Sequence, residues 1–122
     1  MINKAFYYCL KGDYESAISA YTKKIKNKKG TSKDLYNLGL CYIKIKNWEK
    51  ANECFKEAFE SKYQLNNNIQ ISQCFFNLGY TYEKLNEFKK AFLCYKAALA
   101  YNSDDIECAK IVADMEKQLS FC

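Results

Sequence analysis

Asparagine side chains recur at a similar place in three stretches of the 122-residue chain, and they could recognise a peptide backbone. Asn37 and Asn77 lie close before a glycine in segments with helical spacing, and Asn3 lies close before Ala5 in a third such segment. Asparagine is a mediocre helix former that prefers caps, so helix propensity does not explain why asparagine recurs inside these segments. An amide both donates and accepts hydrogen bonds, so it can pair with an extended peptide of any sequence. The alternative interpretation is that asparagine is simply abundant in this chain.

Aromatic and aliphatic residues surround these asparagines at helical spacing. Rigid aromatic side chains anchor a partner at low entropic cost, although at this spacing such residues more often belong to a core. Lysines beside them would favour an acidic ligand or would simply be solvated. The candidate residues of a peptide-binding groove are Asn3, Phe6, Lys33, Tyr36, Asn37, Leu40, Lys44, Phe76, Asn77, Tyr80 and Lys84.

The sequence offers little for catalysis or for metal binding. It has no histidine, so a cysteine nucleophile lacks its usual base, and its seven cysteines include no C-x-x-C pair. Most cysteines lie among apolar neighbours and are expected to be reduced and structural, whereas Cys122 near the end is the thiol expected to react. A glycine-rich phosphate loop is also absent. We therefore expect no enzyme activity, no cofactor and no metal.

The net charge of the chain is modest, and all of its basic residues are lysines. The formal net charge is +5, and six of the nineteen lysines crowd into residues 23–33. No aromatic residues are interleaved with them, so a solvated turn is favoured over a nucleic-acid patch or an acidic-lipid patch. No apolar run is long enough to span a membrane, and the first residues lack a secretory core, so the expected location is cytoplasmic.

The elements that must position the candidate residues repeat along the chain. One copy reads Leu35-x-x-Leu38-Gly39-x-x-Tyr42, followed by Trp48-x-x-Ala51-x-x-x-Phe55-x-x-Ala58. The next reads Phe75-x-x-Leu78-Gly79-x-x-Tyr82, followed by Phe88-x-x-Ala91-x-x-x-Tyr95-x-x-Ala98. A third copy starts the chain with Ala5-x-x-Tyr8 and Tyr14-x-x-Ala17-x-x-x-Tyr21. This order of large, small and aromatic residues predicts stacked helical hairpins.

Periodicity and turn residues predict seven helices in one all-α domain. Their approximate ranges are 2–11, 14–26, 32–46, 48–63, 69–85, 87–101 and 104–119. These form hairpins at about 1–28, 32–63 and 69–101, closed by a capping helix at about 104–119. Because glycine inside a helix costs up to about 1 kcal/mol relative to alanine, Gly39 and Gly79 indicate a close approach of the two helices of a hairpin.

The repeat resembles the tetratricopeptide repeat family across essentially the whole chain. Ala17 and Ala51 are 34 residues apart, which is the spacing of that family. The resemblance implies a right-handed superhelical array of antiparallel hairpins, in which the first helix of each hairpin lines a concave groove. In peptide-binding members an asparagine at this place holds the backbone of the ligand, which implies that role for Asn37 and Asn77, and for Asn3 by extension.

Two features depart from the family pattern. Ala51 and Ala91 are 40 residues apart, so six extra residues lie around Gln64 to Gln70. They form either a helix extension, as in longer repeats that resemble those of kinesin light chain, or an asparagine-rich loop. The usual proline before the next repeat is absent, which should soften the helix boundaries without changing the fold.

The function that the resemblance implies is that of an adaptor binding an extended or helical peptide of a partner protein. The alternative is a structural scaffold or self-association module within a larger protein or complex. RNA binding, known in related helical repeats, fits the hairpin signature less well. A cochaperone that grips the acidic tail of Hsp90 or Hsp70 also fits less well. The charged clamp of those repeats falls on Ile2, Phe6, Asn37, Gln73 and Asn77, of which only Asn37 matches.

Overall fold

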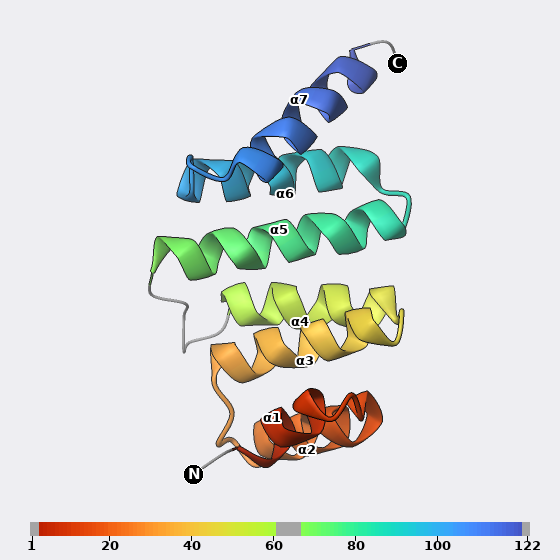
Figure 1. Ribbon diagram of the computed structural model, residues 1–122, viewed down its shortest axis with the longest axis vertical. Coiled ribbons are helices and arrows are strands. Elements are labelled where there is room, and N and C mark those ends of the chain that lie inside the picture. The colour runs from red at the N-terminus through yellow and green to blue at the C-terminus, as the bar shows by residue number, and fades with distance from the viewer. Residues whose placement is uncertain (1–2, 61–66, 121–122) are drawn as a thin grey trace. The chain divides into compact units, whose positions relative to one another are not determined.

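Within the residues that the structure describes, seven α-helices form from the segments that carry helical spacing. The computed structural model describes residues 3–60 and 67–120, and those residues contain no strand. The chain divides into two units, residues 1–65 (unit 1) and residues 66–122 (unit 2). Unit 1 contains α1 (Lys4–Leu10), α2 (Tyr14–Lys26), α3 (Ser32–Lys44) and α4 (Trp48–Glu60). Unit 2 contains α5 (Asn68–Lys84), α6 (Phe88–Tyr101) and α7 (Ile106–Leu119) (Figure 1).

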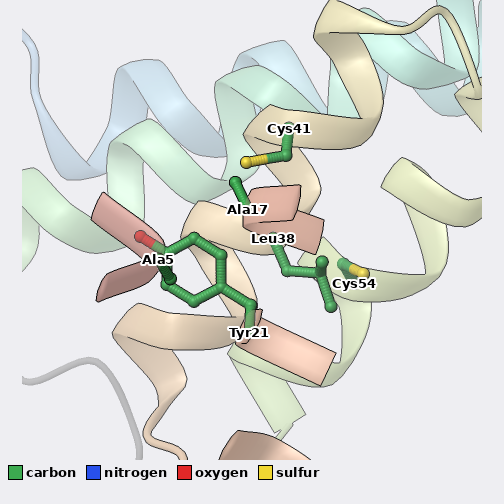
Figure 2. Close-up of a cluster of buried hydrophobic side chains, with 6 residues drawn as sticks. All are labelled: Ala5, Ala17, Tyr21, Leu38, Cys41 and Cys54. Atoms are coloured by element: carbon green, nitrogen blue, oxygen red, sulfur yellow. The ribbon is translucent and has the colours of Figure 1, made fainter. Parts of the chain in front are cut away.

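Small and apolar residues build the core of unit 1. Helix α1 packs on α2, α2 on α3, and α3 on α4. Alanines at the contacts leave the large side chains, chiefly Tyr21, to fill the space between the helices. Figure 2 shows this cluster, which comprises Ala5, Ala17, Tyr21, Leu38, Cys41 and Cys54.

The two helical glycines lie where the hairpins pack most closely. A Cβ atom added to Gly39 in α3 would lie 2.8 Å from the ring of Phe55 in α4. A Cβ atom added to Gly79 in α5 would lie 3.1 Å from the ring of Tyr95 in α6. Both aromatic residues are buried. The close helix approach predicted from the two glycines is confirmed.

Unit 2 repeats this packing and adds a closing helix. Helix α5 packs on α6, and α6 packs on α7 (Figure 1). Cys108 and Val112 of α7 are buried in one cluster with Ala91, Tyr95 and Ala98 of α6. The Cys108 thiol donates to the backbone carbonyl of Tyr95 at 3.3 Å. Helix α7 therefore extends the core of the hairpin formed by α5 and α6.

Four helices end in the same hydrogen-bonded turn. Each continues into a residue with positive φ, namely Gly12, Lys28, Lys46 and Asn86. In each case the next N–H donates to the carbonyl five residues earlier, at 2.9–3.1 Å: Asp13 to Tyr8, Lys29 to Lys24, Asn47 to Tyr42, and Glu87 to Tyr82. This is the Schellman motif, and it satisfies carbonyls at the helix end without proline.

Local capping explains where the helix boundaries differ from the prediction. Helix α2 has the predicted range, but α1 begins at Lys4 instead of Ile2 because the Asn3 side chain accepts from the Ala5 N–H at 2.8 Å as the N-cap. Helix α3 ends at Lys44, two residues early, because Lys46 is left-handed. Helix α7 begins two residues late, after the cap Asp105. The predicted end of the fourth helix at Tyr63 lies outside the described residues.

The described part of the six-residue insertion extends a helix. Helix α5 has 17 residues, whereas α3 has 13. Asn67 caps α5 by accepting from the Gln70 N–H at 2.7 Å, and residues 68–71 form an extra turn before Ser72, which matches Ser32 of α3 in the repeat. Residues 64–66 of the insertion lie outside the described residues.

Candidate functional site

In unit 1, the candidate residues on α3 form a partly exposed face. Tyr36, Asn37 and Leu40 are half-buried, and Lys33 and Lys44 are exposed. The Tyr36 ring packs edge-on against Phe55, with ring centroids 5.5 Å apart. The buried Phe55 ring therefore fixes the position of Tyr36.

In unit 2, α5 presents the same arrangement. Phe76, Asn77 and Tyr80 are half-buried, and the Phe76 ring packs edge-on against Tyr95 at a centroid distance of 5.3 Å. The exposed Lys84 places its ammonium 5.4 Å from the centroid of the Tyr80 ring, which is a cation–π contact. The repeat in the sequence thus produces the same aromatic pair in each unit.

The two asparagines at the matching helical position differ in their hydrogen bonds. The Asn37 side chain bonds the hydroxyl of Tyr21; burial raises the pKa of that hydroxyl to about 12, and the hydrogen bond opposes the rise. The Asn77 Nδ2 donates to the Gln73 carbonyl one turn earlier in α5, at 3.0 Å. The amide of Asn37 thus takes part in the core of unit 1.

Asn3 does not occupy the mid-helix position that the sequence predicts. It is the N-cap of α1, where its Oδ1 is occupied by the Ala5 N–H. It also lines a cavity of about 510 Å³ between α1 and α2, together with Tyr8, Lys23 and Lys24. Phe6 on α1 is 49% exposed. The backbone geometry of Asn3 is therefore not equivalent to that of Asn37 and Asn77.

Two adjoining cavities in unit 2 contain three of the predicted site residues. One, of about 440 Å³, lies between α5 and α7, and its lining includes Phe76 and Tyr80. The other, of about 200 Å³, is lined by Phe76 and Asn77 and reaches the turn before α7. Phe76 and Glu107 line both cavities, so the two cavities adjoin at these residues. This is the groove of unit 2.

Helix α7 contributes residues to this groove that the sequence analysis does not assign to it. Glu107, Ile111, Asp114 and Gln118 line the larger cavity. Their separations of four, three and four residues place them on one face of α7, beside the buried stripe of Cys108 and Val112. A second stripe with this spacing is the signal that could have identified them.

The two described cavities of unit 1 lie away from its candidate residues on α3. A cavity of about 420 Å³ is lined by residues of α2, α3 and α4, including Leu38, Tyr42 and Lys50. Neither this cavity nor the one between α1 and α2 is lined by Tyr36, Asn37 or Leu40.

The thiols and carboxylates in the described part of the chain do not form a metal site. No three cysteine, aspartate or glutamate residues within 3–60 and 67–120 are grouped to hold a metal ion. Burial raises the pKa of the Cys54 and Cys74 thiols to about 12 and that of Cys94 to about 11, so these thiols are protonated at neutral pH. Cys122 lies outside the described residues.

No helix in the described residues combines the length and the apolar character needed to cross a membrane.

Comparisons with known proteins identify similar sequences and folds. The family model described as tetratricopeptide repeat matches residues 31–103. No curated protein matches the chain. The crystal structure of MamA has a TM-score of 0.85 and 20% identity, covering 98% of this chain and 67% of that one. The first repeat domain of Spaghetti (RPAP3), bound to an HSP90 peptide, has a TM-score of 0.81 and 18% identity over 96% of this chain and 88% of that one. The second repeat domain of human RPAP3, in complex with an HSP70 peptide, has a TM-score of 0.78 and 18% identity over 93% of this chain and 89% of that one.

Proposed function

The chain belongs to the tetratricopeptide repeat family, and from that premise we propose that it binds a peptide segment of a partner protein along α5 of unit 2. Its fold is the all-α solenoid of helix hairpins typical of the family, whose domains serve as protein-interaction scaffolds. In this proposal Asn77 pairs with the backbone of the peptide, and the neighbouring aromatic residues select its side chains. Asn37 on α3 is proposed for the same role within unit 1.

The observation that carries the proposal is the groove of unit 2. Phe76, Asn77 and Tyr80 occur on one face of α5 and line two adjoining cavities. An aromatic surface beside an amide provides both an apolar anchor and a group that recognises backbone. A repeat surface with these two components suits a peptide better than it suits a small polar substrate.

The structural relatives include RPAP3 domains bound to HSP90 and HSP70 peptides. At about 18% identity they inform only on the fold. Phe6 and Gln73 stand at two positions of the charged clamp that cochaperone repeats use, and neither side chain is charged. We therefore propose a partner other than these acidic chaperone tails.

Replacing Asn77 with alanine will weaken partner binding about tenfold and leave the melting temperature nearly unchanged. A hydrogen bond to a ligand is worth about 0.5–1.5 kcal/mol, and an unpaired backbone group in the ligand adds to that loss. The partner is first isolated by mass spectrometry of proteins retained on the immobilised domain, and its affinity is then measured by calorimetry.

The matched control is Asn68→Ala, in the same helix, exposed and outside both cavities. Asn37 is a poorer first test, because its alanine variant also removes the hydrogen bond to the buried Tyr21 hydroxyl. Equal affinities for Asn77→Ala and Asn68→Ala would show that the peptide does not lie along α5.

A further inference from the structure

The larger cavity of unit 2 has an apolar floor. Phe76 and Tyr80 of α5 and Ile111 and Met115 of α7 line it. Phe76 is held by its edge-on contact with the buried Tyr95 ring. This floor suits an aliphatic stem.

Three carboxylates surround this floor. Glu83 of α5 and Glu107 and Asp114 of α7 line the cavity, and among its described lining residues there is no lysine. All three carboxylate residues are exposed, and Glu83 also accepts a hydrogen bond from the Tyr95 hydroxyl at 2.8 Å. Lys84, the nearest lysine on α5, lies over the Tyr80 ring.

The charge of the chain is distributed unequally between the two units. Residues 1–65 contain thirteen lysines and seven acidic residues, whereas residues 66–122 contain six lysines and seven acidic residues. The net charge of +5 thus arises from unit 1, and unit 2 has a formal charge of −1. A ligand of unit 2 meets an acidic cavity in a slightly acidic unit, which favours a basic ligand.

We propose that the cavity between α5 and α7 binds a lysine or arginine side chain of the partner peptide. Its aliphatic stem lies on Ile111 and Met115, and its charge faces Glu107 and Asp114. Asn77 in the adjoining cavity then pairs with the backbone of the same peptide. This inference rests on the proposed function, and it reverses the acidic preference expected from Lys33, Lys44 and Lys84.

The test uses two short fluorescein-labelled peptides, one built of leucine–lysine pairs and one with glutamate in place of lysine. Fluorescence anisotropy should show about tenfold tighter binding of the lysine peptide to residues 1–122. The double variant Glu107→Lys/Asp114→Lys should remove this preference. The matched control is Glu116→Lys, which changes an exposed acid of α7 that does not line the cavity.

Three outcomes would overturn the inference. The glutamate peptide could bind as tightly as the lysine peptide, the double variant could behave like Glu116→Lys, or neither peptide could bind. Light scattering of the same variants identifies a further contradiction: dimers that disappear only in the double variant would assign the cavity to a second copy of this chain. The proposed function is decided separately, by the effect of Asn77→Ala on partner capture.

A second and independent observation concerns two thiols of unit 1. The Sγ atoms of Cys9 in α1 and Cys41 in α3 are 3.4 Å apart, which is a hydrogen-bonded contact between two reduced side chains. Cys9 is half-buried, whereas Cys41 is 2% exposed and belongs to the core cluster (Figure 2). The two residues are 32 positions apart in the sequence.

We propose that a peroxide oxidises this pair to a disulfide that joins α1 to α3. The Cys9 thiolate attacks hydrogen peroxide, the O–O bond breaks, and a sulfenic acid and hydroxide form. The Cys41 sulfur then attacks the Cys9 sulfur and displaces a second hydroxide, and each hydroxide takes one of the two thiol protons. Two thiols and one peroxide thus give one disulfide and two waters.

Accessibility decides which thiol reacts first. Burial raises the pKa of the Cys41 thiol to about 12, and the hydrogen bond with Cys9 adds to the rise. Cys41 is therefore the resolving thiol, and the half-buried Cys9 is the one that peroxide reaches.

Mild peroxide treatment of the Cys122→Ser variant should join the peptides containing Cys9 and Cys41, with the loss of two hydrogen atoms in mass spectrometry. Closing a loop of this length should raise Tm by roughly 10 °C, and dithiothreitol should reverse the change. Cys9→Ser and Cys41→Ser should each prevent the change, whereas Cys94→Ser, a half-buried thiol of unit 2, should not. Oxidation of Cys9 to a sulfinic acid without a cross-link, or a cross-link to a different cysteine, would overturn the proposal.

Discussion

Replacing Gly39 with alanine will lower the free energy of unfolding by about 1–3 kcal/mol, and the same replacement will raise it in a Phe55→Ala background. The added Cβ atom would lie 2.8 Å from two ring atoms of Phe55. The ring is fully buried and contacts Tyr36, so it cannot turn away without disturbing its neighbours. The steric cost therefore exceeds the gain in helix propensity.

Removing the ring reverses this balance. Phe55→Ala alone should cost about 3–5 kcal/mol, the usual cost of deleting a buried phenylalanine. In that background the Cβ atom at position 39 no longer meets the ring, and alanine gains up to about 1 kcal/mol over glycine in a helix. Urea unfolding of the four chains, followed by circular dichroism, gives the coupling free energy directly.

Gly79→Ala serves as the comparison. Its nearest atoms, in the Tyr95 ring, lie at 3.1 Å, so its cost should be smaller than that of Gly39→Ala. If alanine at position 39 has the same sign of effect with and without Phe55, the Phe55 ring is not the reason for the glycine.

Replacing Asp34 with alanine will lower the free energy of unfolding by about 2–4 kcal/mol, as expected when a charge-assisted hydrogen bond and a helix cap are lost together. Asp34 is 5% exposed, and its carboxylate forms a capping box with Thr31. It accepts from the Thr31 N–H at 2.9 Å and from its hydroxyl at 3.1 Å. It also pairs with the Lys24 ammonium of α2 at 3.1 Å.

Two further variants separate the cap from the ion pair. Lys24→Met removes only a partly exposed partner and should cost about 1 kcal/mol or less. Asp34→Asn keeps a side-chain oxygen, so its loss in the free energy of unfolding should lie between those of Asp34→Ala and Lys24→Met. Urea unfolding at low and high salt provides the measurement, since salt weakens the ion pair more than the cap. A loss in Asp34→Ala no larger than that in Lys24→Met would show that the capping box does not stabilise α3.

The sequence was sufficient to predict the fold class, because the residues that pack the two helices of a hairpin together recur in the repeat. Gly39 and Gly79 recur with an aromatic partner in the next helix, and that pairing determines how two helices pack. The range of α2 was also predictable, since Asp13 and the residues after Lys26 carry the cap and stop signals.

The candidate site was only partly predictable, because its residues depend on contacts between helices. The sequence identifies the face of α5 that carries Asn77, but not the face of α7 that opposes it, since the buried stripe of α7 gives the stronger signal. It also gives no sign that the Asn37 amide bonds the Tyr21 hydroxyl of another helix. The capping role of Asn3 depends on where α1 begins, and helix ends are the least determined part of a periodic pattern.

The turns inside the hairpins have a consequence for how the chain acquires its structure. Asp13 ends one helix with its backbone N–H and caps the next with its side chain, and Asn47 does the same. These bonds join residues no more than five positions apart, so a hairpin can close before any later part of the chain exists. Synthesis on the ribosome, which releases one hairpin after another, thus matches the order in which this protein can fold, and fast folding of each newly released segment limits its exposure to aggregation.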